Sequence, residues 1–509
     1  MAGAASAGTI QWSSRFAFIM AAVGSSVGLG NLWRFSAEAG SNGGGAFIII
    51  YLACVIFIGI PVLMSEYMIG RAGDANSAIR SVQDVAKRSG VTERWSSLGW
   101  TGMIASFLIV SFYCVVAAWV IMYIPKFLFG SFDGQTAEQI SAQFTEARSN
   151  IWGLSPNRLG VMWAFTAFAI LTTWLVARGV NAGIEWAAKV LMPMFFALLI
   201  LLSLYSLWSG FSTEIVTASG ETSNGTVEAL KFLFRPDWSV LNGEIVTSAL
   251  GQAFFSIGLG SAIMITYGSY LPKDINIPKS SAIVALTDAG VALIAGLAIF
   301  PIVFAHGLDV NSGAGLFFET LPIALHGAPG GKFIGSGFFF LAIFAAVTSS
   351  ISLLEPIVAW VSERFEIPRR KAAIIMGTLM WVLGLGSIFI SGFMDVLDGK
   401  LTSVILLPLT GLLTVLFVGW KMKKSIVDEQ MAGNSELIRN ILYYLVRYVA
   451  PVFVAIVLIF GAFSTFRTFI DKVLGSPYFF PIVALAVLGL LSLITSRVGQ
   501  IQQSLGDKD

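Results

Sequence analysis

Charged residues are scarce in this chain, where Asp, Glu, Lys and Arg make up 12% of 509 positions and hydrophobic residues make up 56%. With a mean hydropathy of +0.81, this balance excludes an ordinary water-soluble protein and indicates many membrane-spanning segments. The formal net charge of +2 is too small to suggest nucleic acid or another charged polymer as a partner. The partner that the composition does indicate is the lipid bilayer.

Cysteine and histidine are scarce as well. Cys54 and Cys114 both lie in apolar stretches, which favours small core residues over a disulfide. The two histidines, His306 and His326, have no familiar metal-site spacing. No nucleophile and base cluster near one depth of the membrane, so we expect no enzyme. The segment 1–14 lacks the pattern of a cleaved signal peptide.

Apolar stretches of about 20 residues, enough to cross a ~30 Å hydrocarbon core, recur along the chain. About twelve such spans are expected near 15–38, 45–70, 99–125, 159–177, 188–209, 244–270, 281–304, 333–361, 372–392, 399–420, 441–463 and 477–497. Basic clusters at 71–94, 364–371 and 421–424 fall on the side of the N-terminus. This bias predicts a multi-pass protein of the cell (inner) membrane with both termini in the cytoplasm.

Two of these stretches are interrupted by a similar glycine pattern, at residues 24–30 and 256–261. A helix in lipid must satisfy its own backbone polar groups, so such interruptions survive where the freed groups line a protected cavity. Paired interruptions in two halves of a chain point to a midplane substrate site in a secondary transporter with inverted repeats.

Several strings of residues resemble a known family. They are AVGSSVGLGNLWRF at 22–35, NGGGAF at 42–47, GIPVLMSEYMIGR at 59–71, GQAFFSIGLG at 251–260, VTSS at 347–350 and LDGKLTSVILLPLTGLL at 397–413. In this order they resemble the neurotransmitter:sodium symporter family, and in particular its bacterial leucine-transporter-like amino-acid carriers. The resemblance implies an all-α integral membrane fold of two inverted five-helix repeats plus two peripheral helices.

The same resemblance implies a division of the chain. We expect a transport core at 1–421, with repeats at about 13–210 and 244–421, then two peripheral helices at 438–497 and a cytoplasmic tail at 498–509.

A sodium site is suggested by one face of the eighth span. Ala345, Thr348, Ser349 and Ser352 lie at i, i+3, i+4 and i+7, and their hydroxyl oxygens suit a hard cation. On spacing alone, a packing seam with interhelical hydrogen bonds explains the pattern equally well.

The family resemblance implies two sodium ions. One set of ligands would be the carbonyls of Gly24, Val27 and Ala345 with the hydroxyls of Thr348 and Ser349. The other set would be Ser26, Asn31, Ser256, Asp288 and the carboxylate of the substrate.

The residue at position 28 indicates the substrate class. The amine carriers of the family have an aspartate there, whereas this chain has Gly28, so the ligand should carry its own carboxylate. The expected substrate-binding residues are Ser25, Ser26, Gly28, Leu29, Gly30, Ile109, Tyr113, Phe255, Ser256, Gly258, Ser261, Ser349 and Leu353. Because Gly258 and Ser261 are small, we expect a larger, partly polar pocket and a bulky apolar or aromatic amino acid.

Gates are implied at both ends of the site. Arg34 and Asp398 resemble the external gate pair, although Glu38, at i+4 from Arg34, is an alternative partner. The internal gate is less regular. Glu363 is its acidic member, but Thr9 stands three residues before Trp12, where the family has a basic residue. Either Arg15 replaces that residue or no internal salt bridge forms.

The remaining polar and irregular positions inside the membrane also have expected roles. Glu66 and Glu355 read as carboxylates that tie helices together. Gly183 and Pro193 match a pattern with which some family members unwind the fifth helix, although membranes also tolerate such pairs. Asp288, with Ala292 one turn later, is expected to replace chloride and to carry a proton back. As an alternative, Asp288 is simply a stronger sodium ligand.

Together these features predict a sodium-coupled amino-acid symporter that works by alternating access without chloride. An ion channel is disfavoured because the sequence has no repeated pore loop. A non-transporting amino-acid sensor on the same fold would share every binding feature and remains the alternative.

Overall fold

The computed structural model describes residues 10–73, 75–148, 156–216, 220–310, 315–390 and 392–474. The chain divides into two compact units, 1–458 and 459–509. Apart from the end of helix α21 (Ala450–Leu474), which belongs to the second unit, the description below concerns the first. Its described part is helical except for one short antiparallel pair, β1 (Glu214–Val216) and β2 (Thr222–Asn224).

Helices of the first half alternate with short 3-10 or π-helical segments, denoted η. They are α1 (Arg15–Ser26), η1 (Gly30–Arg34), α2 (Phe35–Ser41), α3 (Gly45–Cys54), η2 (Val55–Gly59), α4 (Ile60–Ala72), α5 (Ala78–Arg88), η3 (Glu93–Ser96), α6 (Ser97–Leu128), α7 (Ala137–Arg148), α8 (Pro156–Ala177), η4 (Val180–Glu185) and α9 (Trp186–Phe211).

The second half continues in the same manner. Its elements are α10 (Gly225–Phe234), η5 (Trp238–Val240), α11 (Gly243–Ile257), α12 (Ile263–Ser269), α13 (Ile277–Ala305), η6 (Leu316–Thr320), α14 (Leu321–Gly327), α15 (Gly331–Phe365), α16 (Arg369–Phe389), α17 (Phe393–Asp395), η7 (Val396–Leu406), α18 (Leu407–Leu416), η8 (Phe417–Lys421), α19 (Lys424–Gln430), α20 (Glu436–Tyr444) and η9 (Leu445–Val449).

The expected membrane spans can be followed through the described residues. Among the described residues, nine helices are long and apolar enough to cross a membrane, and the bent pair of α1 with η1 and α2 would make a tenth span. The sixth expected span is divided into α11 and α12, each too short to cross alone. The twelfth, 477–497, lies outside the described residues. The prediction of an all-α membrane protein is confirmed.

Local sequence explains where several of these helices begin. Ser14, Asn242 and Asn276 precede α1, α11 and α13, and each side-chain oxygen accepts a hydrogen bond from a backbone N–H of the first turn. Such caps satisfy amides that the helix itself leaves unpaired. Pro278 stands in the first turn of α13, where proline costs no hydrogen bond.

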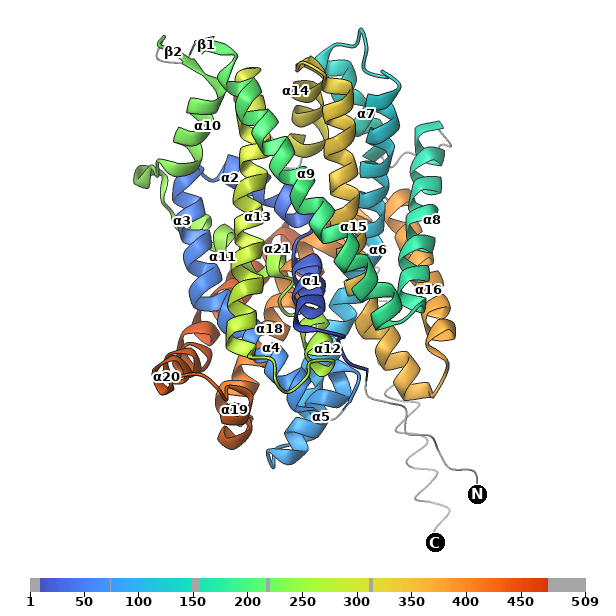
Figure 1. Cartoon of the computed structure of the whole chain (residues 1–509), viewed down its shortest axis with the longest axis vertical. Coiled ribbons are helices and arrows are strands. Elements are labelled where there is room, and N and C mark those ends of the chain that lie inside the picture. Colours follow the sequence, from blue (N-terminus) through green and yellow to red (C-terminus); the bar gives the residue numbers. More distant parts are fainter. Residues whose placement is uncertain are drawn as a thin grey trace. The chain divides into compact units, whose positions relative to one another are not determined.

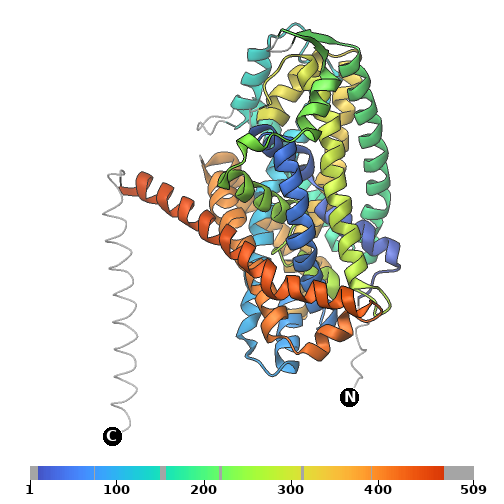
Figure 2. The same cartoon turned by 90° about the vertical axis from the view of Figure 1, so that its left-hand side faces the viewer.

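Two broken helices of opposite direction lie at the centre of the first unit. In Figure 1 the chain rises from α1 to α2, whereas it descends from α11 to α12. Helix α15 packs against α6, α1 and α9. The long helix α13 runs beside the column formed by α3, η2 and α4 in both views (Figures 1 and 2). This arrangement brings both breaks to the same interior region.

Candidate functional site

The first break begins where α1 ends at Ser26. Val27 is extended (φ −73°, ψ 99°), and the helix resumes at Gly30 at an angle of 50°. The side chain of Asn31 stabilises this turn, because its Oδ1 accepts a hydrogen bond from the Gly28 N–H at 3.0 Å. The freed backbone groups of the break therefore face an interior that is lined by protein.

The second break depends on left-handed backbone conformations. Gly258 and Gly260 have φ of 74° and 76°, values that glycine adopts without strain. The carboxylate of Glu66 accepts a hydrogen bond from the Gly260 N–H at 2.7 Å. The two breaks meet directly, since the Ser26 hydroxyl donates to the Ile257 carbonyl at 3.1 Å.

A buried polar cluster joins the two breaks to α13. The Asn31 amide donates to Asp288 Oδ1 at 2.8 Å and to Ser256 Oγ at 3.0 Å, and Ser256 Oγ donates to Asp288 Oδ2 at 2.7 Å. All three side chains are at most 3% exposed. No Lys or Arg of the described residues pairs with this carboxylate. The carboxylate of Asp288 is buried and its partners, the Asn31 amide and the Ser256 hydroxyl, are neutral donors, so its charge is uncompensated, which fits the binding of a hard cation such as sodium.

A second group of oxygens lies where α15 contacts α1. Ser349 Oγ donates to the carbonyls of Ser25 (3.3 Å) and Gly24 (3.4 Å). Thr348 Oγ1 donates to the Ala345 carbonyl at 3.1 Å. Val27, the fifth residue of the expected ligand set, is the buried C-cap of α1. The structure thus brings these five residues together, and their oxygens are of the type that sodium prefers.

The fourth residue of the small-residue stripe has a different contact. Ser352 Oγ accepts a hydrogen bond from the Tyr267 hydroxyl at 2.7 Å and donates to the Thr348 carbonyl at 2.8 Å. It therefore links α15 to α12, which is the packing role that the spacing alone also allowed.

A cavity of about 50 Å³ lies between the breaks. It is lined by Ser25, Ser26, Gly28, Gly30, Ile109, Tyr113, Phe255, Ser256, Gly258, Ser261, Ile263, Ser349, Leu353 and Leu407. Every expected substrate residue except Leu29 is in this set, and Leu29 lines the adjoining cavity. The Ser25 hydroxyl is buried and has no hydrogen-bond partner among the residues that the structure describes, so it is free for a ligand.

Two further side chains line the cavity beside the small residues of the second break. The side chains of Ile263 and Leu407, which the sequence analysis did not include, line the space beside Gly258 and Ser261. Ser261 Oγ also turns toward the backbone, where it donates to the Gly258 carbonyl at 2.5 Å. The size of the pocket with a ligand bound stays a prediction.

Position 28 has no room for a longer side chain. A Cβ on Gly28 would lie 2.6 Å from Ser349 Oγ and 3.1 Å from the Tyr113 hydroxyl. That hydroxyl accepts a hydrogen bond from the Leu29 N–H at 3.3 Å. Tyr113 and the break in α1 thus form one polar wall of the cavity, which contains no carboxylate of its own.

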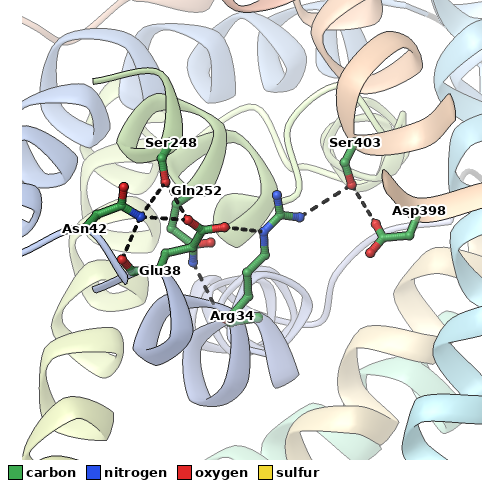
Figure 3. Close-up of polar contacts among 8 residues, drawn as sticks. Arg34, Glu38, Asn42, Ser248, Gln252, Asp398 and Ser403 are labelled. Atoms are coloured by element: carbon green, nitrogen blue, oxygen red, sulfur yellow. Dashed lines mark hydrogen bonds and ion pairs between the residues drawn. The ribbon is translucent and has the colours of Figure 1, made fainter. Parts of the chain in front are cut away.

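A larger cavity, of about 300 Å³, adjoins the first and contains both residues of the expected external gate. Figure 3 shows that Arg34 lies between Glu38 and Asp398. Its Nε is 3.9 Å from Glu38, and its NH1 reaches Ser403 Oγ at 3.5 Å. Ser403 in turn donates to Asp398 at 2.7 Å. The ion pair in this structure is the alternative one, with Glu38, and a hydroxyl connects Arg34 to Asp398.

At the opposite end, Glu363 has a cationic partner that the sequence analysis missed. Arg80 of α5 lies 3.5 Å from its carboxylate, which also accepts hydrogen bonds from the Ser77 hydroxyl and the Asn76 N–H. Arg15 forms no ion pair with Glu363 among the described residues, and whether it belongs to an internal gate stays a prediction. Thr9 lies outside the described residues.

Trp12 and Glu185 fix the segment that precedes α1. The Trp12 indole N–H donates to the Tyr267 carbonyl at 3.1 Å. Glu185, 4% exposed at the end of η4, accepts hydrogen bonds from the Ser13 N–H at 3.1 Å, from the Ser13 hydroxyl and from Lys189 at 2.6 Å. Asn181 donates to Glu185 and to the Gln11 carbonyl. The N-terminal segment is thus attached to the start of α9.

The same region contains the expected unwinding pair. Gly183 lies in the π-helical segment η4, where a Cβ would collide with the Leu175 carbonyl, and Pro193 lies inside α9. The two buried carboxylates also tie elements together. Glu355 pairs with Arg369 and accepts a hydrogen bond from the Tyr270 hydroxyl at 2.8 Å, and Glu66 holds the second break.

Comparisons with known proteins agree with this geometry. The model of the sodium:neurotransmitter symporter family matches residues 10–137 and 135–499. The chain belongs to this family. As in other family members, its transport is sodium-dependent, and it is not an enzyme.

Among relatives of this sodium:neurotransmitter symporter, an uncharacterized sodium-dependent transporter of Bacillus subtilis, YhdH, is 37% identical over 88% of this chain and 96% of its own. A corresponding transporter of Haemophilus influenzae is 32% identical over 89% and 98%. The crystal structure of MhsT in complex with L-phenylalanine has a TM-score of 0.78 and 37% identity, over 89% of this chain and 100% of MhsT. The leucine-transporter-type fold is thereby confirmed.

Proposed function

We propose that this symporter carries an amino acid whose carboxylate helps to bind one of two co-transported sodium ions. The observation that carries the proposal is a shared wall. Ser256 lines the small cavity and also belongs to the buried cluster with Asn31 and Asp288. A carboxylate in the cavity would therefore approach the same oxygens that would hold the ion.

The charge and dipoles around the cavity favour such a ligand. The helix that starts at Gly30 attracts an anion through its dipole, and the Leu29 N–H, which donates to the Tyr113 hydroxyl here, would donate to the carboxylate of the ligand. Gly28 contributes no competing carboxylate. The ammonium group would be met by carbonyls near Ser26 and Phe255. If ion and ligand share contacts, each must raise the affinity for the other by the same factor.

A bulky apolar or aromatic substrate is supported by two observations. MhsT, whose entire chain is covered by the structural match, was crystallised with L-phenylalanine. In this chain, the small residues Gly258 and Ser261 add little side-chain bulk beside Ile109 and Leu353. Entry of a large side chain requires Ile263 or Leu407 to move aside, because the cavity here holds about 50 Å³.

Uptake into proteoliposomes tests the proposal. An inward sodium gradient should drive accumulation of labelled phenylalanine, and replacement of sodium by choline should abolish it. Counterflow separates the transporter from a sensor on the same fold, since a sensor binds the amino acid but never exchanges it across the membrane. Binding without counterflow would overturn the proposal.

We further propose that Asp288 supplies the negative charge that chloride gives to other carriers. Its carboxylate is 0% exposed and belongs to the buried polar cluster with Asn31 and Ser256. Ala292, one turn later, adds no other charge. Uptake should persist when gluconate replaces chloride. Asp288→Asn should either lose activity or acquire chloride dependence, with Asn31 and Ser256 left intact. Wild-type transport that stops without chloride would refute the idea.

Closure toward the N-terminal side would rest on two contacts. Glu363 with Arg80 holds α15 to α5, and Glu185 with Lys189 holds Ser13 to α9. Their release would free the segment before α1, so that this half-helix opens a path to the ions. Gly183 and Pro193 would let α9 unwind at the same place.

A further inference from the structure

A groove outside the transport pathway runs along the surface between α8 and α16. It has a volume of about 440 Å³ and is lined from Thr166 to Ala177 on α8 and from Arg370 to Trp381 on α16. The lining positions recur every three or four residues on both helices, so each helix presents one continuous face. Ile170 and Ile374, which line it, are 63% and 51% exposed.

The length of the groove matches one leaflet of a bilayer. Arg370 and Trp381 are eleven positions apart on α16. At 1.5 Å of rise per residue, the groove is about 16 Å long, or about half of a ~30 Å hydrocarbon core. The far end is closed, because the Trp381 indole N–H donates to Thr166 Oγ1 at 3.0 Å. Beneath the groove the helices touch, since a Cβ on Gly377 would collide with Thr173.

The other end of the groove carries positive charge. Arg370 lines it, and Arg178 directly follows Ala177, the last lining residue of α8. Its guanidinium lies 4.9 Å from the ring centre of Trp174, which also lines the groove, and 5.9 Å from that of Trp186 on α9. Among the described residues neither arginine has a carboxylate within 4 Å, whereas the neighbouring Arg369 is paired with Glu355. Free guanidinium groups suit a phosphate, which they bind through two parallel N–H donors.

An apolar channel of one-leaflet depth with an open cationic mouth has the shape and charge of a bound lipid. We propose that the groove binds one acyl chain of an anionic phospholipid and that Arg178 and Arg370 bind its headgroup phosphate. The lipid comes from the leaflet at which α1 begins, because η4, which directly follows α8, contacts α1. The basic clusters predict that this leaflet is cytoplasmic.

Native mass spectrometry of the purified full chain tests this assignment. The protein is incubated with equal amounts of phosphatidylglycerol and phosphatidylcholine of identical chains, and retained lipids are counted. Wild type should retain one phosphatidylglycerol in preference to phosphatidylcholine. Arg178→Gln with Arg370→Gln should lower that occupancy about tenfold. The control, Lys87→Gln with Arg94→Gln, removes two exposed charges outside the groove and should leave the occupancy unchanged.

A third variant tests the acyl chain separately from the headgroup. Ala177→Trp fills the groove and keeps both arginines, so it should also displace the lipid. Retention of phosphatidylglycerol by Ala177→Trp, or its displacement by inorganic phosphate, would mean a simple anion site and overturn the proposal. A groove that joins two copies of the chain would overturn it too, and would appear as dimers that the variants dissociate without a change in lipid count. All variants must remain monodisperse in size-exclusion chromatography.

Discussion

The two helix breaks serve one cavity but are stabilised in different ways. The second break, between α11 and α12, is held by backbone conformation and by its neighbours. Gly260 packs against the Leu407 carbonyl, and the Ser106 hydroxyl donates to the Ser261 carbonyl at 2.5 Å. The first break, between α1 and η1, is held mainly by the side chains of Asn31 and Ser349. The second is therefore a fixed support, whereas the first depends on groups that ions would engage.

The largest effect should come from the fixed support. In Gly260→Ala, the added Cβ would collide with the Leu407 carbonyl, so we expect little monodisperse protein. Gly258→Ala is the matched control, because its φ is similar but the nearest atom to its Cβ is 3.9 Å away. Gly258→Ala should lower the free energy of unfolding only by the strain of an alanine in the left-handed conformation, about 1–2 kcal/mol. Thermal unfolding and size-exclusion profiles measure both, and equal losses would contradict the role of the close packing at Gly260 in supporting the second break.

A large loss of function with an intact fold should follow at the first break. Thr348→Ala combined with Ser349→Ala removes two proposed sodium ligands, so sodium-driven uptake should be abolished. Ser350→Ala, on the same helix, removes a hydrogen bond to Thr172 and should transport nearly normally. Uptake into proteoliposomes and the unfolding midpoint separate function from stability. Normal uptake by the double variant would exclude these ligands.

An intermediate effect is expected at the segment before the first break. Glu185→Gln keeps the size of the side chain but weakens its bonds to Lys189 and Ser13, so the inward-open state should become more populated. A thiol at Ser25, in Ser25→Cys, should then react faster with a membrane-impermeant reagent added from the N-terminal side. Glu228→Gln, which disturbs an i,i+3 ion pair with Lys231 on α10, away from the segment before α1, provides the control. An unchanged labelling rate would show that Glu185 does not hold the segment closed.

The smallest effect should be a change in ligand ranking. Ser261→Phe places bulk beside Ile263 in the second break, so smaller aliphatic amino acids should compete better relative to phenylalanine, by about tenfold or less. Ser212→Phe, at the exposed end of α9 and outside both cavities, should leave the ranking unchanged. Competition with the twenty amino acids measures both. If the ranking is unchanged in Ser261→Phe, this pocket does not select the side chain.

The sequence was sufficient for features that one segment encodes by itself. Both breaks follow from local glycine patterns, and the face of α15 follows from helical spacing at Thr348 and Ser349. Twelve of the thirteen expected substrate residues line one cavity because their motifs belong to a family whose fold arranges them. The identity of the carried ligand and the number of ions stay predictions.

Contacts between distant segments could not be predicted in this way. Glu185 and Ser13 are 172 residues apart, and Ser77 and Glu363 are 286 apart. Neither segment by itself indicates its partner, because polar residues such as these are common at helix ends. The volume of the cavity also depends on packing, since Leu407 comes from a helix whose motif suggested only an external gate.

The chain's two cysteines have a practical consequence for observing these movements. Cys54 and Cys114 are 7% and 0% exposed and both are free thiols, so each lies within the packed interior. A reagent in the surrounding water should react slowly with either. A single cysteine introduced at the larger cavity, for example Ser403→Cys, would then be the site that takes up a fluorophore or spin label, with no need to remove the native thiols first.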